Sequence, residues 1–229
     1  MRLLGHSATL SAFRWDLVHL RAQLLSDARP GVSDLAPLVE DFIKQITVER
    51  AAFEQAEDEW IIKNALLLKT DKHRDGVLIQ AGGVARATDK ELYATLFPTY
   101  NPSQTARLGV AAESAEIKRI LGEMAKLPVD HPVRVAYEKE LSDAEAGVVA
   151  ADKQSEDAVT ALALQRSQID RFKLKVDQAR LTVHGNLLVL LKSKAEADAF
   201  FRTTSSAPGE EAKKEEPAAP VAPPPGGTP

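Results

Sequence analysis

The most constraining feature of the sequence is an apolar seven-residue repeat that begins at Tyr137 and continues to Leu190. Alternating steps of four and three residues meet sixteen positions, of which only Ser155, Gln165 and Asn186 are polar. A heptad pattern of this length predicts a helix whose apolar edge is covered by another helix, because an isolated apolar stripe would stay in water. The large apolar residues of this predicted interaction seam are Tyr137, Leu141, Val148, Leu162, Ile169, Phe172, Val176, Val183 and Leu190.

Two interpretations are kept for the end of this segment, where Gly185 precedes Asn186. Asn186 at a core position would fix the register or the oligomeric state, as polar residues do in coiled coils. A bend at Gly185 would instead turn Asn186 toward water. A helix that is unbroken over 133–201 would span about 100 Å at 1.5 Å per residue.

Helical spacing extends to most of the remaining chain. A first helix is predicted by Leu10, Phe13, Leu17, Leu20 and Leu24, which share one face. A second long helix starts near Ser33, and a shorter helix covers 103–127. No segment shows the sustained two-residue alternation of a strand. The sequence therefore predicts an all-α fold, an elongated antiparallel helical bundle with two long coiled-coil-like helices.

The two long segments share a frame. Subtracting 102 from the seam positions gives the apolar positions of the second helix, from Leu35 onward. Agreement of frame alone arises by chance about one time in seven. An internal duplication of 33–99 and 133–203 is therefore left open, within a helical bundle over 1–202. Residues 203–229 are rich in Pro, Ala, Glu and Lys and predict a disordered tail, because they contain too little apolar surface to fold.

The stretch KTDKHRDGVLIQAGGVARATDKE mixes acids, bases and glycines. A calcium loop that starts at Asp71 would have Gly82 where the bidentate acid belongs. A phosphate-binding loop would have Gly83 where its lysine belongs. A helix explains the stretch better, with Lys72 and Arg74 on a solvated surface. Each of the two glycines weakens a helix by about 1 kcal/mol relative to alanine, so we predict a bend or an end there and no functional site.

Charge and residue usage exclude several classes of function. The net charge of −4 and the pI near 5.8 argue against nucleic-acid binding, which needs a positive surplus. There is no cysteine, and among the scattered histidines only Asp16 with His19 comes near a di-metal motif. The acidic run EQAEDE is interpreted as surface, with Glu59 and Lys63 as an ion-pair ladder. We therefore predict no catalytic residue, no cofactor and no metal ligand.

These exclusions favour a non-catalytic structural, scaffold or adaptor protein and not an enzyme. It would act through helix-face contacts with a protein partner or by self-assembly, with no nucleic acid and no evident small-molecule substrate. Trp60 and Tyr137 are expected to fill the core. A bundle-core metal-binding protein and a membrane-active protein, lipid-binding or pore-forming through GNLLVLL over 185–191, are the alternatives. A cytoplasmic location is expected, because Arg14 and Asp16 interrupt any signal-like apolar region near the N-terminus.

Overall fold

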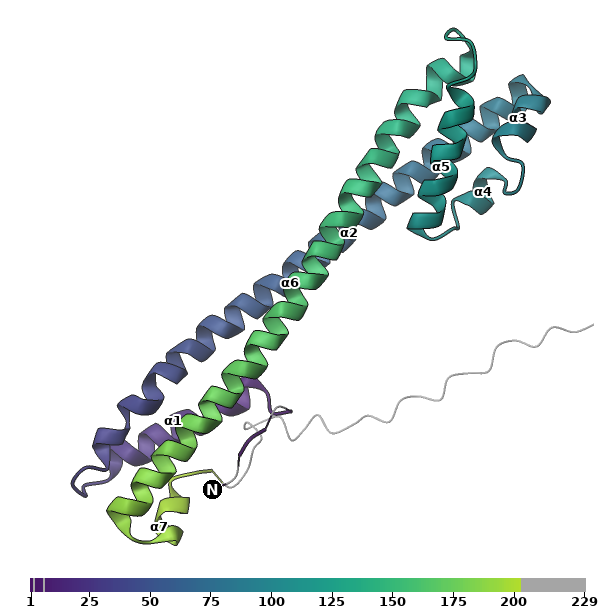
Figure 1. The fold of residues 1–229 in the computed structure, drawn as a ribbon. Helices are drawn as coiled ribbons and strands as arrows, with labels where there is room; N and C mark the ends of the chain where they lie inside the picture. The colour runs from purple at the N-terminus through teal and green to yellow at the C-terminus, as the bar shows by residue number, and fades with distance from the viewer. Residues whose placement is uncertain (2, 6, 203–229) are drawn as a thin grey trace, which may run out of the picture. The chain divides into compact units, whose positions relative to one another are not determined.

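The computed structural model describes residues 1, 3–5 and 7–202, and within these residues all regular structure is helical. The predicted all-α bundle with two long helices is confirmed. The long helices are α2 (Pro37–Thr88) and α6 (Pro132–Leu191). The chain divides into two compact units, and each long helix contributes one part to each (Figure 1). The predicted tail lies outside the described residues.

Unit 1 contains the described residues up to Ala51 and those from Ser167 to Arg202. Its first helix, α1 (Leu10–Ser26), begins where the Thr9 side chain accepts a hydrogen bond from the backbone N–H of Ala12. The short 3₁₀ helix η1 (Ser33–Leu35) leads into α2, whose first residue is Pro37. Proline is tolerated there because the first helical N–H has no partner inside the helix.

The core of unit 1 joins the predicted face of α1 to the beginning of α2, the end of α6 and the short helix α7 (Lys194–Ala199). Phe13, Leu17, Leu20 and Leu24 are fully buried, as their spacing predicts. Phe42 on α2 and Phe172 on α6 meet with ring centroids 6.1 Å apart. Burial of each large apolar side chain contributes about 1.5–3 kcal/mol to the free energy of folding, and this is the main force that holds these helices together.

The last long helix ends earlier than a continuous helix over 133–201 would. α6 stops at Leu191, because Lys192 takes a left-handed conformation with φ of 53° and Ser193 then caps α7. The helix passes through Gly185 without interruption, and Asn186 is exposed. Of the two interpretations of Asn186, exposure to water holds, although no break in the helix produces it.

Unit 2 spans Ala52–Arg166 and contains the rest of both long helices. Lys63 on α2 donates a 3.0 Å hydrogen bond to Gln154 on α6, and Arg74 pairs with Glu145. Rising numbers on one helix therefore meet falling numbers on the other, so the two helices are antiparallel here. Three shorter helices complete the unit, and they are α3 (Lys90–Leu96), α4 (Pro102–Thr105) and α5 (Val110–Met124).

A bend or an end was predicted at Gly82 and Gly83. The end is wrong, because α2 continues to Thr88, and the bend stays a prediction. Gly82 is placed where another element approaches closely. A Cβ atom at Gly82 would lie 2.2 Å from Cγ of Pro102, at the start of α4, whereas a Cβ at Gly83 would meet nothing within 4 Å. Gly82 therefore permits close packing of α4 on α2, and the packing outweighs its low helix propensity.

The helix predicted over 103–127 is two helices. Asn101 and Gln104 form a capping box that begins α4, which ends after one turn at Thr105. Gly109 then stands in an extended conformation as the N-cap of α5. Ile117, Ile120 and Met124 of α5 are buried against α2, α3 and α6 in the core of unit 2.

Candidate functional site

A buried cluster of charged side chains joins three helices of unit 2. Arg74 of α2 has no exposed side-chain surface. Its guanidinium lies 2.6 Å from Oδ1 of Asp71 and 2.9 Å from a carboxylate oxygen of each of Glu113, on α5, and Glu145, on α6. It also donates a 3.0 Å hydrogen bond to Oγ of Ser114. Arg74 therefore links the packing of α5 and α6 to α2.

The Arg74 cluster, which also includes Asp75, has more acids than bases. Burial, together with the contact with the Asp75 carboxyl, raises the pKa of Glu113 to about 8. Burial likewise raises the pKa of Asp75. A carboxyl in such surroundings keeps its proton at neutral pH, because a second buried negative charge next to Asp75 is costly. Glu113 and Asp75 therefore share a proton under ordinary conditions.

The same cluster offers the described residues that come nearest to a metal centre. One carboxylate oxygen from each of Asp71, Asp75 and Glu113 lies within 4.8 Å of the others. Carboxylate oxygens are the ligands that calcium and magnesium prefer. However, the guanidinium of Arg74 contacts Asp71 and Glu113 directly and supplies positive charge at the same place. The contacts that the structure shows are those of a buried ion network that fixes the helices.

Unit 1 contains a related arrangement around Arg180 of α6. Its Nε lies 2.6 Å from Oδ2 of Asp16 on α1, and it also pairs with Asp177, three residues earlier on its own helix. Burial raises the pKa of Asp16, although Arg180 acts in the opposite direction. The guanidinium carbon lies 5.7 Å from the centre of the Phe201 ring. In each unit, a buried arginine thus ties a short helix to a long one.

Neither the buried cluster around Arg74 nor the one around Arg180 was predicted from the sequence. Arg74 was placed on a solvated surface, but it is fully buried. Its position was the available signal, because Arg74 falls in the apolar frame that runs through Leu67 and Val77. Asp16 was considered only because its spacing from His19 comes near a di-metal motif, and no metal ligand was predicted. The partners that explain both residues lie far away along the chain, so spacing alone does not identify them.

The predicted interaction seam of α6 lies largely inside the chain. Seven of its nine residues are buried, namely Leu141, Val148, Leu162, Ile169, Phe172, Val176 and Val183. Tyr137 is half-buried and packs against the core of unit 2. Leu190 is 43% exposed, whereas Leu187, one residue after the seam position of Asn186, is buried in the core of unit 1. The frame therefore slips by one residue after Val183, and a role of the seam toward a partner stays a prediction.

Another surface of α2 carries apolar side chains that its own chain leaves uncovered. This apolar belt consists of Trp60, Ile61, Ile62, Leu66 and Leu68, each at least 37% exposed. Trp60 is thus not the core residue that we expected. The predicted ladder of Glu59 and Lys63 is also absent, because the Lys63 ammonium group bonds to Gln154. The sequence contained the signal for the belt, since Ile62 and Leu66 are four residues apart and lie outside the seam frame.

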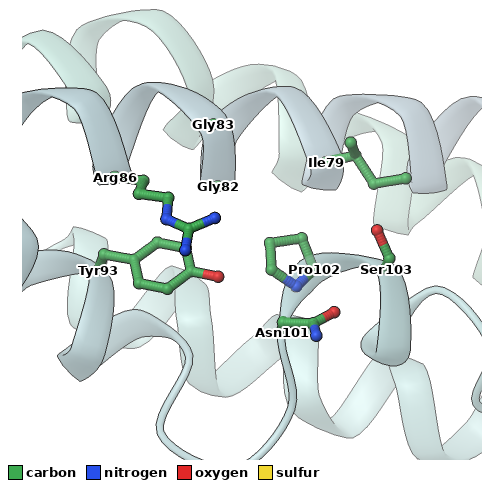
Figure 2. Close-up of a pocket in the computed structure, with 8 residues that line it drawn as sticks. All are labelled: Ile79, Gly82, Gly83, Arg86, Tyr93, Asn101, Pro102 and Ser103. Carbon is green, nitrogen blue, oxygen red and sulfur yellow. The ribbon is translucent and has the colours of Figure 1, made fainter.

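A cavity of about 500 Å³ lies between α2, α3 and α4 (Figure 2). The guanidinium of Arg86 lies over the ring of Tyr93, 5.4 Å from its centre, and Pro102 packs closely against Gly82 at the edge of the cavity. Its lining also includes Asn101 and has no carboxylate and no histidine. The polar groups of this lining are the Arg86 guanidinium, the Tyr93 hydroxyl, the Asn101 amide and the Ser103 hydroxyl.

No family model, no curated protein and no solved structure matches the chain. Among the residues that the structure describes, none of the helices has the length and apolar character needed to cross a membrane.

Proposed function

We propose that the chain is a non-catalytic structural or adaptor protein that binds another protein chain through the apolar belt of α2. The single observation that carries this proposal is the exposure of five large apolar side chains within nine residues of one helix. Scattered apolar residues are common on protein surfaces, but five within nine residues are a local concentration, and such a concentration marks an interaction surface.

The surroundings of the belt support a protein partner. Within unit 2, residues of α2 from Val77 onward pack with α3 and α5 in the core, whereas Lys63, which precedes them, bonds to Gln154 of α6. The belt lies in these preceding turns. The negative net charge of the chain does not suit a nucleic acid, whose phosphates require clustered lysine and arginine. Helix-face contact with a protein suits an apolar helical surface best.

The proposal is tested by the mass of the native complex. We expect the tagged chain in a lysate of its source organism to elute well above its monomer mass of 24.9 kDa. Replacing the four aliphatic belt residues by serine should return it to the monomer mass. Serine at Val129 and Val135, which are 78% and 67% exposed outside the belt, is the matched control and should change nothing. A chain that elutes as a monomer before any substitution would contradict the proposal.

A further inference from the structure

We propose that the occupant of this surface is a second copy of the chain, packed antiparallel on one strip of α2. The inference rests on the proposed function and adds the identity and orientation of the partner. The α2 strip consists of residues with successive spacings of four, three, four, three and four, namely Gln55, Glu59, Ile62, Leu66, Lys69 and His73. All six are exposed. This spacing places them on one face of the helix, as in a coiled-coil seam.

The strip lies on the exposed side of α2, and only its end at His73 borders α6, where a hollow is also lined by Glu140 and Asp143. Successive residues turn by about 100° around a helix, so the strip lies roughly 100° from the edge that carries Arg74. Arg74 faces α5 and α6 through Glu113 and Glu145. His73, its neighbour, remains exposed. A second helix can therefore lie along the strip without displacing either of the helices that Arg74 holds.

The order of residues along the strip selects its partner. An acidic residue, Glu59, precedes the apolar centre of Ile62 and Leu66, and a basic residue, Lys69, follows it. When two copies run antiparallel about a two-fold axis near residue 64, Ile62 meets Leu66 of the other copy and Glu59 meets Lys69. Each contact occurs twice, because the same surface is used on both copies. A parallel alignment would instead place like charges opposite each other.

Local structure on the acidic side of the strip fits this pairing. A shallow cavity of about 290 Å³ is lined by Gln55, Asp58, Glu59, Ile62 and Lys63. Two of these residues are carboxylates, and the one ammonium group is engaged with Gln154. The cavity therefore offers negative charge beside an apolar wall, which suits the long side chain of a lysine.

The two charged residues of the strip are available for this contact. Neither Glu59 nor Lys69 takes part in any of the ion pairs among the described residues.

A lipid surface is a poorer occupant of the strip, because helices that bind membranes carry a polar face rich in lysine and arginine. Glu59 beside Ile62 would be repelled by an anionic lipid headgroup.

Charge reversal tests the pairing directly. We expect the purified full chain to have a dimer mass, twice 24.9 kDa, by light scattering and sedimentation over a wide concentration range. Glu59→Lys alone and Lys69→Glu alone should each raise the dissociation constant by about tenfold or more, because each reversal acts twice per dimer. The combined variant should restore the dimer, since it exchanges the signs of both partners.

Matched controls on α6 separate this effect from a general change of charge. Glu156→Lys and Lys153→Glu make the same charge changes at exposed positions of the same unit and should leave the dimer unchanged. Circular dichroism should show equal helix content for all variants. A monomeric wild-type chain, or a combined variant as weak as the single ones, would overturn the inference. If the wild type is monomeric yet forms a belt-dependent complex in lysate, only the inference fails and the proposed function stands.

Discussion

Nη1 of Arg74 lies 2.9 Å from Oε2 of Glu145, and both side chains are buried between α2 and α6. Glu113 of α5 approaches the same guanidinium from a third helix. Taking such groups out of water is costly, and the network tolerates burial because the Arg74 guanidinium lies beside the Glu145 carboxylate while Glu113 keeps its proton at neutral pH. The cluster is therefore more sensitive to loss of one member than to loss of all its charges.

Substitution of Arg74 by methionine should destabilise the chain by about 3–5 kcal/mol, because it leaves the Glu145 carboxylate buried without a cation. Urea denaturation followed by circular dichroism measures the change. Lys72→Met, at an exposed position of the same helix, is the control and should stay within about 0.5 kcal/mol of the wild type. Adding Glu113→Gln and Glu145→Gln to the Arg74 variant should recover part of the loss. An Arg74 variant as stable as the control would contradict this account of the cluster.

Stability should fall as the pH rises from about 4.5 to about 8. In the unfolded chain Glu113 has an ordinary pKa near 4.5, whereas burial raises it to about 8 in the folded chain. The folded state therefore binds the extra proton within this window, and the free energy of unfolding declines as that proton is lost. Thermal melts across the window measure the trend. Glu113→Gln should flatten it, and an unchanged slope in that variant would show that another group is responsible.

The two adjacent glycines of α2 should respond oppositely to alanine. Gly82→Ala should cost about 1–3 kcal/mol, because the new methyl group would lie 2.2 Å from Pro102 Cγ and force α4 away. Gly83→Ala should stabilise the chain by up to about 1 kcal/mol, because it meets no atom and improves helix propensity. Both variants are denatured in parallel, and each serves as the control for the other. Equal effects at both positions would argue against the close approach of Pro102.

Periodicity predicted the helices well because it reports directly on which face is buried. The face of α1 from Phe13 to Leu24 and the α6 seam through Val183 are both covered as expected. Helix ends were harder, since they depend on contacts that are distant in sequence. Helix α2 continues through Gly82 and Gly83 because Pro102 packs there. The helix predicted over 103–127 is interrupted before α5, where Gly109 adopts an extended conformation.

The candidate sites were less predictable than the fold. The burial of Arg74 depends on partners far away along the chain, among them Glu145, which is 71 residues away. The exposed strip follows the same spacing as a buried seam, so sequence alone does not show which of the two faces of α2 its own chain covers. The structure distinguishes them, because Ile46 is 1% exposed whereas Ile62 is 63% exposed.

The internal duplication stays a prediction, with a modified alignment. Arg74 and Arg180 have the same kind of environment, and each follows an aspartate by three residues. These pairs are separated by 106 residues, one helical turn more than the shift of 102 that aligned the apolar frames. Residues with the same role therefore align better at the longer shift.

The antiparallel contact between two copies is tested most directly by disulfide cross-linking, since the chain contains no cysteine of its own. An equimolar mixture of Ile62→Cys and Leu66→Cys chains should form a covalent dimer on mild oxidation, because these positions face each other across the proposed axis. Either variant alone should link slowly, since its own cysteines would be offset by four residues along the helices, beyond the roughly 4.4–6.8 Å between Cα atoms that a disulfide spans. A mixture that links no faster than either variant alone would contradict the proposed packing.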